Sequence, residues 1–287
     1  MWVGRVPARA RASGWAPVHA RGEPAGYDRG VSYDPGVYWS EVARHVDARP
    51  AGGDWDLAGD DGPFHRYKRV LMLERLATID VAGRSVLELG PGPGGNLRVL
   101  HEHGAGRLVG CDIAPEMVRL ARRNLGDRAD IHQLDGPALP LADRGIEVAL
   151  TVTVLQHNPD ETVVALLDEL TRVAESTLEL IEDTTTHRPR SWGSSYFVRD
   201  VNQYIAWVTA RGFRLVDVQP IKVWASEQAW LAVHRLGRLA ARHASSEGRT
   251  ASRPEVAAER LLLSVTRRID PRLPPLWGPT AMRFQRA

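Results

Sequence analysis

Three carboxylates and a glycine-rich turn are spaced along the chain in a way that suits one ligand site. Residues 86–95 read Val-Leu-Glu-Leu-Gly-Pro-Gly-Pro-Gly-Gly, an apolar segment that turns through glycines into an expected helix. Glycines permit unusual backbone angles and let a ligand approach the main chain closely. In open α/β sheets, ligands bind beyond the carboxyl ends of the strands, where the first loop meets the first helix. The segment therefore predicts a ligand-binding turn.

The glycines alone leave two kinds of ligand open. Gly90, Gly92 and Gly95 also match the dinucleotide-binding pattern Gly-x-Gly-x-x-Gly. Glu88, two residues before the first glycine, would repel the two phosphates of a dinucleotide, but it could accept a hydrogen bond from an amino-acid ammonium group. This position of Glu88 favours a ligand that carries an ammonium group.

Two aspartates follow the next two expected strands. Asp112 ends the second strand, where its two oxygens could accept hydrogen bonds from both hydroxyls of a ribose. Asp135 follows the third strand, where it could accept from the exocyclic amine of an adenine. Taken singly, Asp112 could be a helix N-cap before Pro115, and Asp135 an ordinary loop acid. Their placement after successive strands predicts a nucleoside site.

These residues together resemble the motifs of class I S-adenosylmethionine-dependent methyltransferases, in particular the small-molecule, type 11-like domain. Residues 88–94 are similar to the motif Glu-x-Gly-x-Gly-x-Gly. Residues 112–117 resemble the second motif, Asp-x-Ser-x-x-Met, with Ala114 where serine is common. Asp135-Gly136 matches the third motif, and residues 154–159 resemble the segment after the fourth strand.

The resemblance implies that the cofactor is S-adenosylmethionine and indicates how it would be held. The glycines would line its methionine part, with Gln156 near that end, and Asp112 would hold the ribose. Ile113 and Met117 would flank the adenine, and Asp135 would bind the adenine edge. The full set of expected cofactor-binding residues is Glu88, Gly90, Pro91, Gly92, Gly94, Asp112, Ile113, Met117, Asp135, Gly136 and Gln156.

Three residues are candidates for acid–base chemistry. Methyl transfer needs mainly alignment of the reactants, and an oxygen or protonated nitrogen acceptor can also need a base. His157 follows the fourth strand and would face the site, although a structural duty in the cofactor pocket is an alternative. Glu182 and Asp183 follow the fifth strand, where they could hold an amine or deprotonate a hydroxyl. A solvated loop is the alternative for both acids.

Four further residues could contact the ligands. Trp192 and Tyr196 lie in the next expected loop and could form a wall of the acceptor pocket. Arg66 could pair with the methionine carboxylate, and Tyr67 could contact it. Both could equally be helix-surface residues.

Strands alternate with helices from residue 85 onward, which predicts a mainly parallel sheet covered on both faces. The resemblance implies a Rossmann-like α/β fold with a seven-stranded, mostly parallel sheet. Its final strand would run antiparallel between the fifth and sixth, after a helical insertion. We expect strands at 85–89, 108–111, 130–133, 146–152, 177–181 and 213–223, and helices at 38–46, 64–79, 94–103, 115–125, 160–173 and 199–211.

The chain divides into five expected segments. These are a disordered leader (1–35), an N-terminal helical cap (36–84), the cofactor-binding core (85–225), a helical insertion or lid (226–275) and the final strand (276–287). The insertion carries two apolar stripes, Trp230-Val233-Leu236 and Val256-Leu261-Leu263-Val265. We expect it to pack on the sheet edge, with a substrate-shaping cap or a homodimer contact as alternatives.

Composition narrows the class of protein. The chain has 287 residues, of which 43% are hydrophobic and 25% charged, as is usual for a globular protein. A net charge of +2 gives no electrostatic footprint for nucleic acid. The sequence has no run of about 18 apolar residues, so we expect no membrane-spanning helix. We also expect no peripheral membrane contact. Cys111 is a single cysteine, and no histidine spacing predicts a metal site. We expect a cytoplasmic protein.

We predict an enzyme that methylates an oxygen or nitrogen atom of a small molecule. A methyltransferase that acts on RNA or protein is an alternative, weakened because residues 156–159 lack an Asn-Pro-Pro-Tyr-type motif. An NAD(P)-dependent oxidoreductase is disfavoured by Glu88 and Asp135. A non-catalytic protein that binds the cofactor also fits the motifs.

Overall fold

The computed structural model describes residues 33–49, 58, 62–186, 189–192, 195–240, 252–274 and 277–287. Residues 1–32 of the expected leader lie outside the described residues, as do residues 50–57 and 59–61 and His187.

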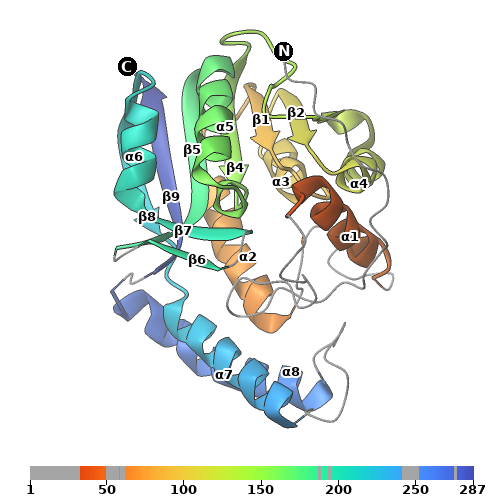
Figure 1. Cartoon of the computed structure of the whole chain (residues 1–287), viewed down its shortest axis with the longest axis vertical. Coiled ribbons are helices and arrows are strands. Elements are labelled where there is room, and N and C mark those ends of the chain that lie inside the picture. The colour runs from red at the N-terminus through yellow and green to blue at the C-terminus, as the bar shows by residue number, and fades with distance from the viewer. Residues whose placement is uncertain are drawn as a thin grey trace.

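A nine-stranded sheet crosses the centre of the described structure (Figure 1). Strands β3, β2, β1, β4 and β5 lie parallel in this spatial order. Strand β9 runs antiparallel between β5 and β8. The predicted α/β fold, including the inserted antiparallel last strand, is confirmed. The bounds are β1 Ser85–Leu89, β2 Arg107–Asp112, β3 Asp130–Gln133, β4 Ile146–Val152, β5 Ala174–Thr185, β8 Phe213–Pro220 and β9 Trp277–Arg286.

Two short strands raise the number above the seven predicted. Strands β6 (Arg190–Trp192) and β7 (Tyr196–Asp200) pair antiparallel, and β7 also pairs with the end of β5. Sequence patterning missed this hairpin because β6 has three residues, too few to display an alternation of apolar and polar positions. The hairpin brings Tyr196 to the carboxyl edge of β5.

Helices cover both faces of the sheet. On one face lie α2 (Pro63–Leu76), α3 (Gly95–Glu102) and α4 (Pro115–Leu125), and on the other α5 (Asp160–Val173) and α6 (Val201–Thr209). The side chains of β1 alternate between the two layers: Val86 joins the first core and Leu87 the second. Burial of each such side chain contributes about 1.5–3 kcal/mol.

Helix α1 (Pro35–Asp47) lies against α4 (Figure 1). The Asp34 carboxylate accepts a hydrogen bond from Val37 N at 3.1 Å, and Pro35 suits the first helical position. Tyr38 and Val42 pack against Met117 in a separate small core. The helix begins one residue before the predicted boundary between leader and cap.

The insertion forms two helices, α7 (Trp224–Ala240) and α8 (Arg253–Ile269), which lie side by side at the bottom of Figure 1. The first predicted stripe is partly confirmed, because Trp230 and Val233 are buried but Leu236 is 67% exposed. The second stripe is wrong as a core face, since Leu261 is 70% and Val265 is 52% exposed.

Acids attach α8 and its following turn to the other helices. The Glu259 carboxylate accepts a hydrogen bond from Phe64 N at 2.6 Å, and Asp270 accepts from Ala225 N at 2.7 Å. Both acids therefore satisfy free N–H groups at the starts of α2 and α7, where negative charge is favourable. These caps explain why α8 turns acids rather than its apolar stripe toward the body of the molecule.

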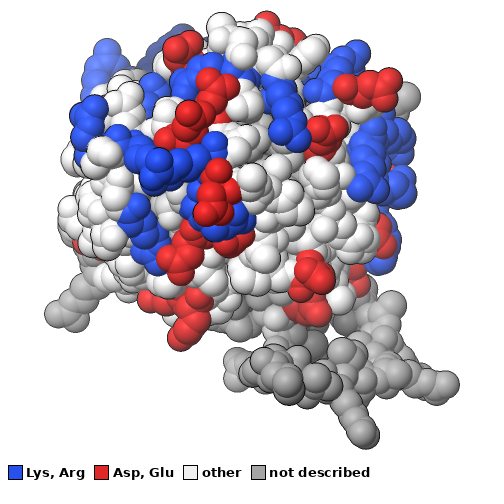
Figure 2. Space-filling view, turned by 90° about the horizontal axis from the view of Figure 1, so that it is seen from above, with Lys and Arg blue, Asp and Glu red and all other residues white. Residues whose placement is uncertain are grey.

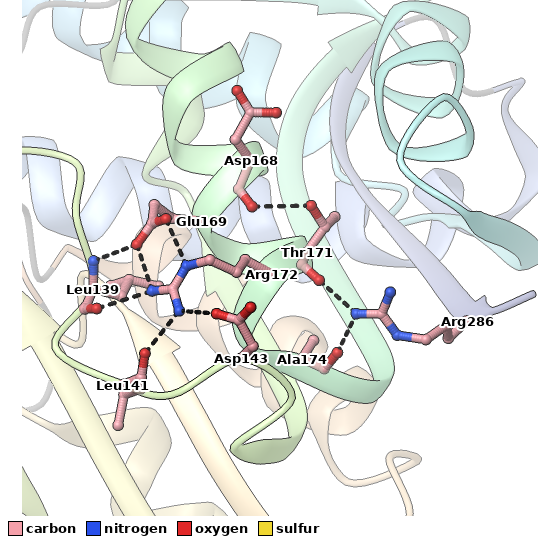
Figure 3. A network of polar contacts seen from close by, with 9 residues as sticks. All are labelled: Leu139, Leu141, Asp143, Asp168, Glu169, Thr171, Arg172, Ala174 and Arg286. Carbon is pink, nitrogen blue, oxygen red and sulfur yellow. Dashed lines mark hydrogen bonds and ion pairs between the residues drawn. The ribbon is translucent and has the colours of Figure 1, made fainter.

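A network of arginine contacts lies at the end of the sheet away from α7 and α8 (Figure 3). The Arg172 guanidinium donates to Leu141 O at 2.8 Å and pairs with Asp143 at 2.7 Å. Arg286, on β9, donates to Thr171 O and Ala174 O, each at 2.5 Å. These contacts hold the loop before β4 and the end of α5 near the amino ends of β4 and β5.

Charges of both signs alternate on the face away from α7 and α8. Figure 2 shows that Lys and Arg side chains are interspersed with Asp and Glu there. None of the described helices is long and apolar enough to cross a membrane.

Candidate active site

A cavity of about 580 Å³ opens beyond the carboxyl ends of the central strands. Its walls come from the turns that follow β1, β2, β3 and β4, together with α1, α2 and α7. This volume lies within the usual range of small-molecule sites, about 300–1,000 Å³. The predicted core, cap and insertion therefore contribute to one cavity.

The glycine turn forms part of the cavity wall. Gly90 and Gly92 have φ values of 68° and 54°, in the left-handed region. A Cβ atom on Gly90 would lie 2.4 Å from Val154 Cγ2, so both its conformation and its space require glycine. Gly90, Pro91 and Gly92 line the cavity, whereas Gly94 does not: it is the N-cap residue before α3, where a Cβ atom would lie 2.8 Å from Leu125 Cδ1.

Asp112 ends β2 and faces the cavity. Its carboxylate accepts hydrogen bonds from Gly92 N at 3.1 Å and Ala114 N at 2.9 Å. Burial raises the Asp112 pKa to about 6, and the backbone N–H groups oppose that rise. The turn after β1 thus fixes the orientation of this carboxylate.

The residues predicted for the adenine end separate into two groups. Ile113, Met117 and Gly136 line the cavity, and Met117 is buried. Asp135 is exposed and lies outside the lining, although both of its chain neighbours belong to it. The adenine-edge role of Asp135 therefore stays a prediction.

Glu88 lies one side chain behind the cavity. Its side chain is fully buried and does not line the cavity. The expected direct contact between Glu88 and a ligand in the cavity is therefore not supported. Asn96 Nδ2 donates to Glu88 Oε1 at 2.5 Å, and Arg69 donates to Asn96 Oδ1. Burial raises the Glu88 pKa to about 7, against the effects of Asn96 and Arg69. Asn96 and Arg69 do line the cavity.

Helix α2 presents Lys68 and Arg69 to the cavity, not Arg66 and Tyr67. Arg66 is exposed, and Tyr67 packs beside the small core of Phe64 and Trp230. Each residue turns the helix by about 100°, so an error of two positions moves a side chain to another face. Of the two alternatives left open for Arg66 and Tyr67, contact with the ligand is therefore not supported, and Arg66 is the helix-surface residue of the other alternative.

Glu182 supports the site from behind it. Its fully buried carboxylate accepts from the backbone N–H groups of Val154, Leu155 and Gln156, each at 3.1 Å. It does not line the cavity, and burial raises its pKa to about 7. The expectation that Glu182 acts on the acceptor is wrong, because its oxygens are occupied in holding this turn.

His157 is carried by the turn that Glu182 holds. Its Nδ1 lies 3.0 Å from Ser195 O, which can only accept, so Nδ1 carries the proton and Nε2 is an acceptor. Burial lowers the His157 pKa to about 4. The ring lies between Trp39 and Tyr196, at centroid distances of 5.1 and 5.5 Å. The cavity wall thus carries a neutral imidazole whose Nε2 is a hydrogen-bond acceptor.

Asp183 faces the cavity and joins three elements. Lys68 Nζ lies 3.3 Å from Asp183 Oδ1, and the Tyr196 hydroxyl donates to Oδ2. Gln156 Oε1 accepts from Asp183 N at 2.7 Å. The structure therefore brings together the predicted residues Gln156, His157, Asp183 and Tyr196. The side chain of Trp192 lies outside the description.

Sequence reasoning missed several side chains of the cavity wall. Glu227 and Trp230 come from α7, three residues apart on one helical face. Trp230 stacks on Phe64 at 5.7 Å and meets the edge of His65 at 5.0 Å. The Glu227–Trp230 spacing was the available signal. Within the described ranges, no group of three or more His, Cys, Asp and Glu side chains could hold a metal ion.

Residues 86–177 match a family model described as a methyltransferase domain. An uncharacterised 37.1 kDa protein in transposon TN4556 of Streptomyces fradiae is 36% identical over 139 residues, which are 42% of this chain and 38% of that protein. A ubiquinone biosynthesis O-methyltransferase of Xanthomonas oryzae is 27% identical over 50% of this chain and 63% of its own length. The chain thus spans less than two thirds of either curated relative.

Two solved structures share the fold. The [4+2]-cyclase SpnF has a TM-score of 0.60 and 17% identity, over 96% of this chain and 99% of its own. Magnesium protoporphyrin IX methyltransferase from Synechocystis PCC 6803, solved with bound S-adenosylmethionine, has a TM-score of 0.54 and 15% identity, over 90% and 100%. At these identities the likeness concerns the fold.

Proposed function

We propose that this chain, a class I S-adenosylmethionine-dependent methyltransferase by its domain match and fold, methylates an oxygen or nitrogen atom of a small molecule. One observation carries the proposal. The lining of a single cavity combines the glycine turn and Asp112, which a hydrogen bond from Gly92 N joins, with His157, Asp183 and aromatic side chains. Such a cavity suits a nucleoside cofactor beside a small acceptor.

The side chains present fit S-adenosylmethionine. Asp112 has a fixed carboxylate for the ribose hydroxyls, Met117 offers an apolar wall for adenine, and the cavity approaches the main chain at Gly90 and Gly92. Arg69 offers a cation for the methionine carboxylate of the cofactor. Glu88 would influence the cofactor only indirectly, because its carboxylate accepts from Asn96, which in turn accepts from Arg69. When bound, the cofactor supplies an electrophilic methyl group on a good leaving group.

The other lining residues, His157, Asp183 and the aromatic side chains, would bind the methyl acceptor. They need to align it, exclude water and, for some acceptors, remove a proton. Aromatic rings from α1, α2 and α7 supply apolar walls. His157 Nε2, the acceptor nitrogen of an imidazole that is unprotonated at neutral pH, would be the base, and its place in the cavity wall supports this role. Asp183, paired with Lys68, would orient polar groups of the acceptor.

A methyl-transfer assay tests this function. Labelled S-adenosylmethionine is incubated with the protein and a panel of small amines, phenols and alcohols, and transferred label is counted. We expect turnover with at least one member, and in His157→Gln we expect kcat to fall by about 10²-fold with little change in cofactor affinity. Cofactor binding without transfer to any member would contradict the proposal, and would fit a protein that uses this fold for other chemistry, as the cyclase does.

A further inference from the structure

The cavity holds a carboxyl group that the proposed chemistry leaves unused. Glu227, on α7, lines the cavity, and its Oε2 is buried. Neither of its carboxyl oxygens accepts a hydrogen bond within the described part of the chain. A buried polar group without a partner is unfavourable, so such a group in a binding cavity points to a ligand that completes it.

The positive charge near Glu227 does not balance the acidic groups around it. Lys68 is engaged by Asp183 at 3.3 Å, and the Tyr196 hydroxyl also donates to Asp183. The charged groups that act on Glu227 are Lys68, Asp183 and Asp270, two acids and one ammonium group. Burial raises the Glu227 pKa to about 8, against the lowering effect of Lys68 and with smaller contributions from the two acids, so the carboxyl is mostly protonated at neutral pH while it has no partner.

The walls beside Glu227 are aromatic. Trp230 follows one turn later on α7, and Phe64 and His65 of α2 pack against it. All three side chains line the cavity. Aromatic rings attract cations and exclude water, which strengthens any charge pair formed beside them.

We propose that the methyl acceptor carries a protonated amine, which binds to the Glu227 carboxylate within this aromatic wall. The inference rests on the proposed function and specifies its substrate class. The amine anchors the acceptor, and Glu227 is a specificity residue contributed by the insertion. A carboxylate–ammonium hydrogen bond is charge-assisted and stronger than a neutral one. A neutral alcohol of the same shape would lack it.

Isothermal calorimetry with matched amine and alcohol pairs tests the inference. The probes are phenethylamine with 2-phenylethanol, tryptamine with tryptophol, and cyclohexylmethylamine with cyclohexylmethanol. They are titrated into the protein loaded with S-adenosylhomocysteine and into the unloaded protein. We expect at least one amine to bind about tenfold or more tightly than its alcohol. The preference should fall below about threefold in Glu227→Gln and persist in Glu161→Gln, which changes an exposed acid on α5.

Proton release gives a second readout. At pH 7 the amine must convert a protonated Glu227 into a carboxylate, so binding should release a proton, seen as a buffer-dependent enthalpy that is lost in Glu227→Gln. Equal affinities for every amine and alcohol pair, or a preference kept in Glu227→Gln, would overturn the inference. Failure of S-adenosylhomocysteine to bind would instead count against the proposed function, while a Glu227-dependent amine preference in the unloaded protein would still support the inference.

Discussion

Neighbouring acids serve different purposes because a strand sends successive side chains to opposite sides. Glu182 turns toward three backbone N–H groups, and Asp183 turns toward the cavity. The sequence predicted that acids stand at this edge, since the alternation of apolar residues located β5. It could not predict which acid faces the cavity, because that depends on where β5 ends relative to the next turn.

Gly90 is needed for its space as well as its backbone angle. We expect Gly90→Ala to lower the free energy of unfolding more than Gly83→Ala, by about 1–3 kcal/mol, since overpacking adds to the shared cost of a positive φ. Gly83 is the matched control: its φ is 70°, against 68°, and a Cβ there would meet nothing within 4 Å. Urea denaturation measures both. Equal losses of unfolding free energy in the two variants would show that the Val154 side chain moves aside at little cost.

The Glu227 pKa predicts a pH-dependent stability. Its folded value, about 8, exceeds the ordinary value of 4.5, so Glu227 stabilises most below pH 4.5 and that contribution is lost as pH rises to about 8. Relative to Glu227→Gln, the native protein should therefore lose a few kcal/mol of unfolding free energy between pH 5 and 8. Chemical denaturation at each pH checks this. A difference independent of pH would mean that Glu227 is ionised throughout.

At the scale of elements, long periodic segments were predictable and short or polar ones were not. Helix α5 lies at the residues predicted, 160–173, because its apolar side chains recur at helical spacing. The β6–β7 hairpin and the acid-capped packing of α8 depend on contacts between distant residues. A shift of two positions around α2 likewise places Lys68 and Arg69, and not Arg66 and Tyr67, in the cavity wall.

Strand β7 secures the turn that carries His157. Buried Arg199 donates to Leu155 O at 3.1 Å and Asn158 O at 2.6 Å, and pairs with Asp160. We expect Arg199→Met to cost about 1–3 kcal/mol of stability, because these carbonyls lose their donor. Once a methyl acceptor has been found, kcat should fall while cofactor affinity changes little.

Arg107→Met is the control for Arg199→Met. It removes an exposed pair with Asp130 at 3.5 Å and should cost under about 1 kcal/mol. If Arg199→Met proved as mild as this control, and kcat were unchanged, Arg199 would have no part in holding the turn.

At the scale of the whole molecule, residues from the cap, core and insertion form one site. Tyr38 of α1, Lys68 of α2, Asp112 of the core and Glu227 of α7 all line the same cavity. The motifs located the cofactor part, since glycine turns and strand-end acids are local features. The rest of the lining combines strand-end residues such as Asp183 with Lys68 and Glu227 of separate helices, and no local pattern in the sequence predicts that those helices meet. The homodimer contact stays a prediction, for which exposed Leu261 and Val265 offer an apolar surface.

We expect the cavity to bind S-adenosylmethionine through Asp112. Calorimetric titration of the protein with S-adenosylmethionine, S-adenosylhomocysteine and NAD tests it most directly, with Asp112→Ala in parallel. We predict micromolar binding of the first two ligands, none of NAD, and a loss of about tenfold or more in the folded variant, because charge-assisted bonds to the ribose disappear. Binding of NAD without either sulfur ligand would contradict the account, and unchanged affinity in Asp112→Ala would remove Asp112 from the site.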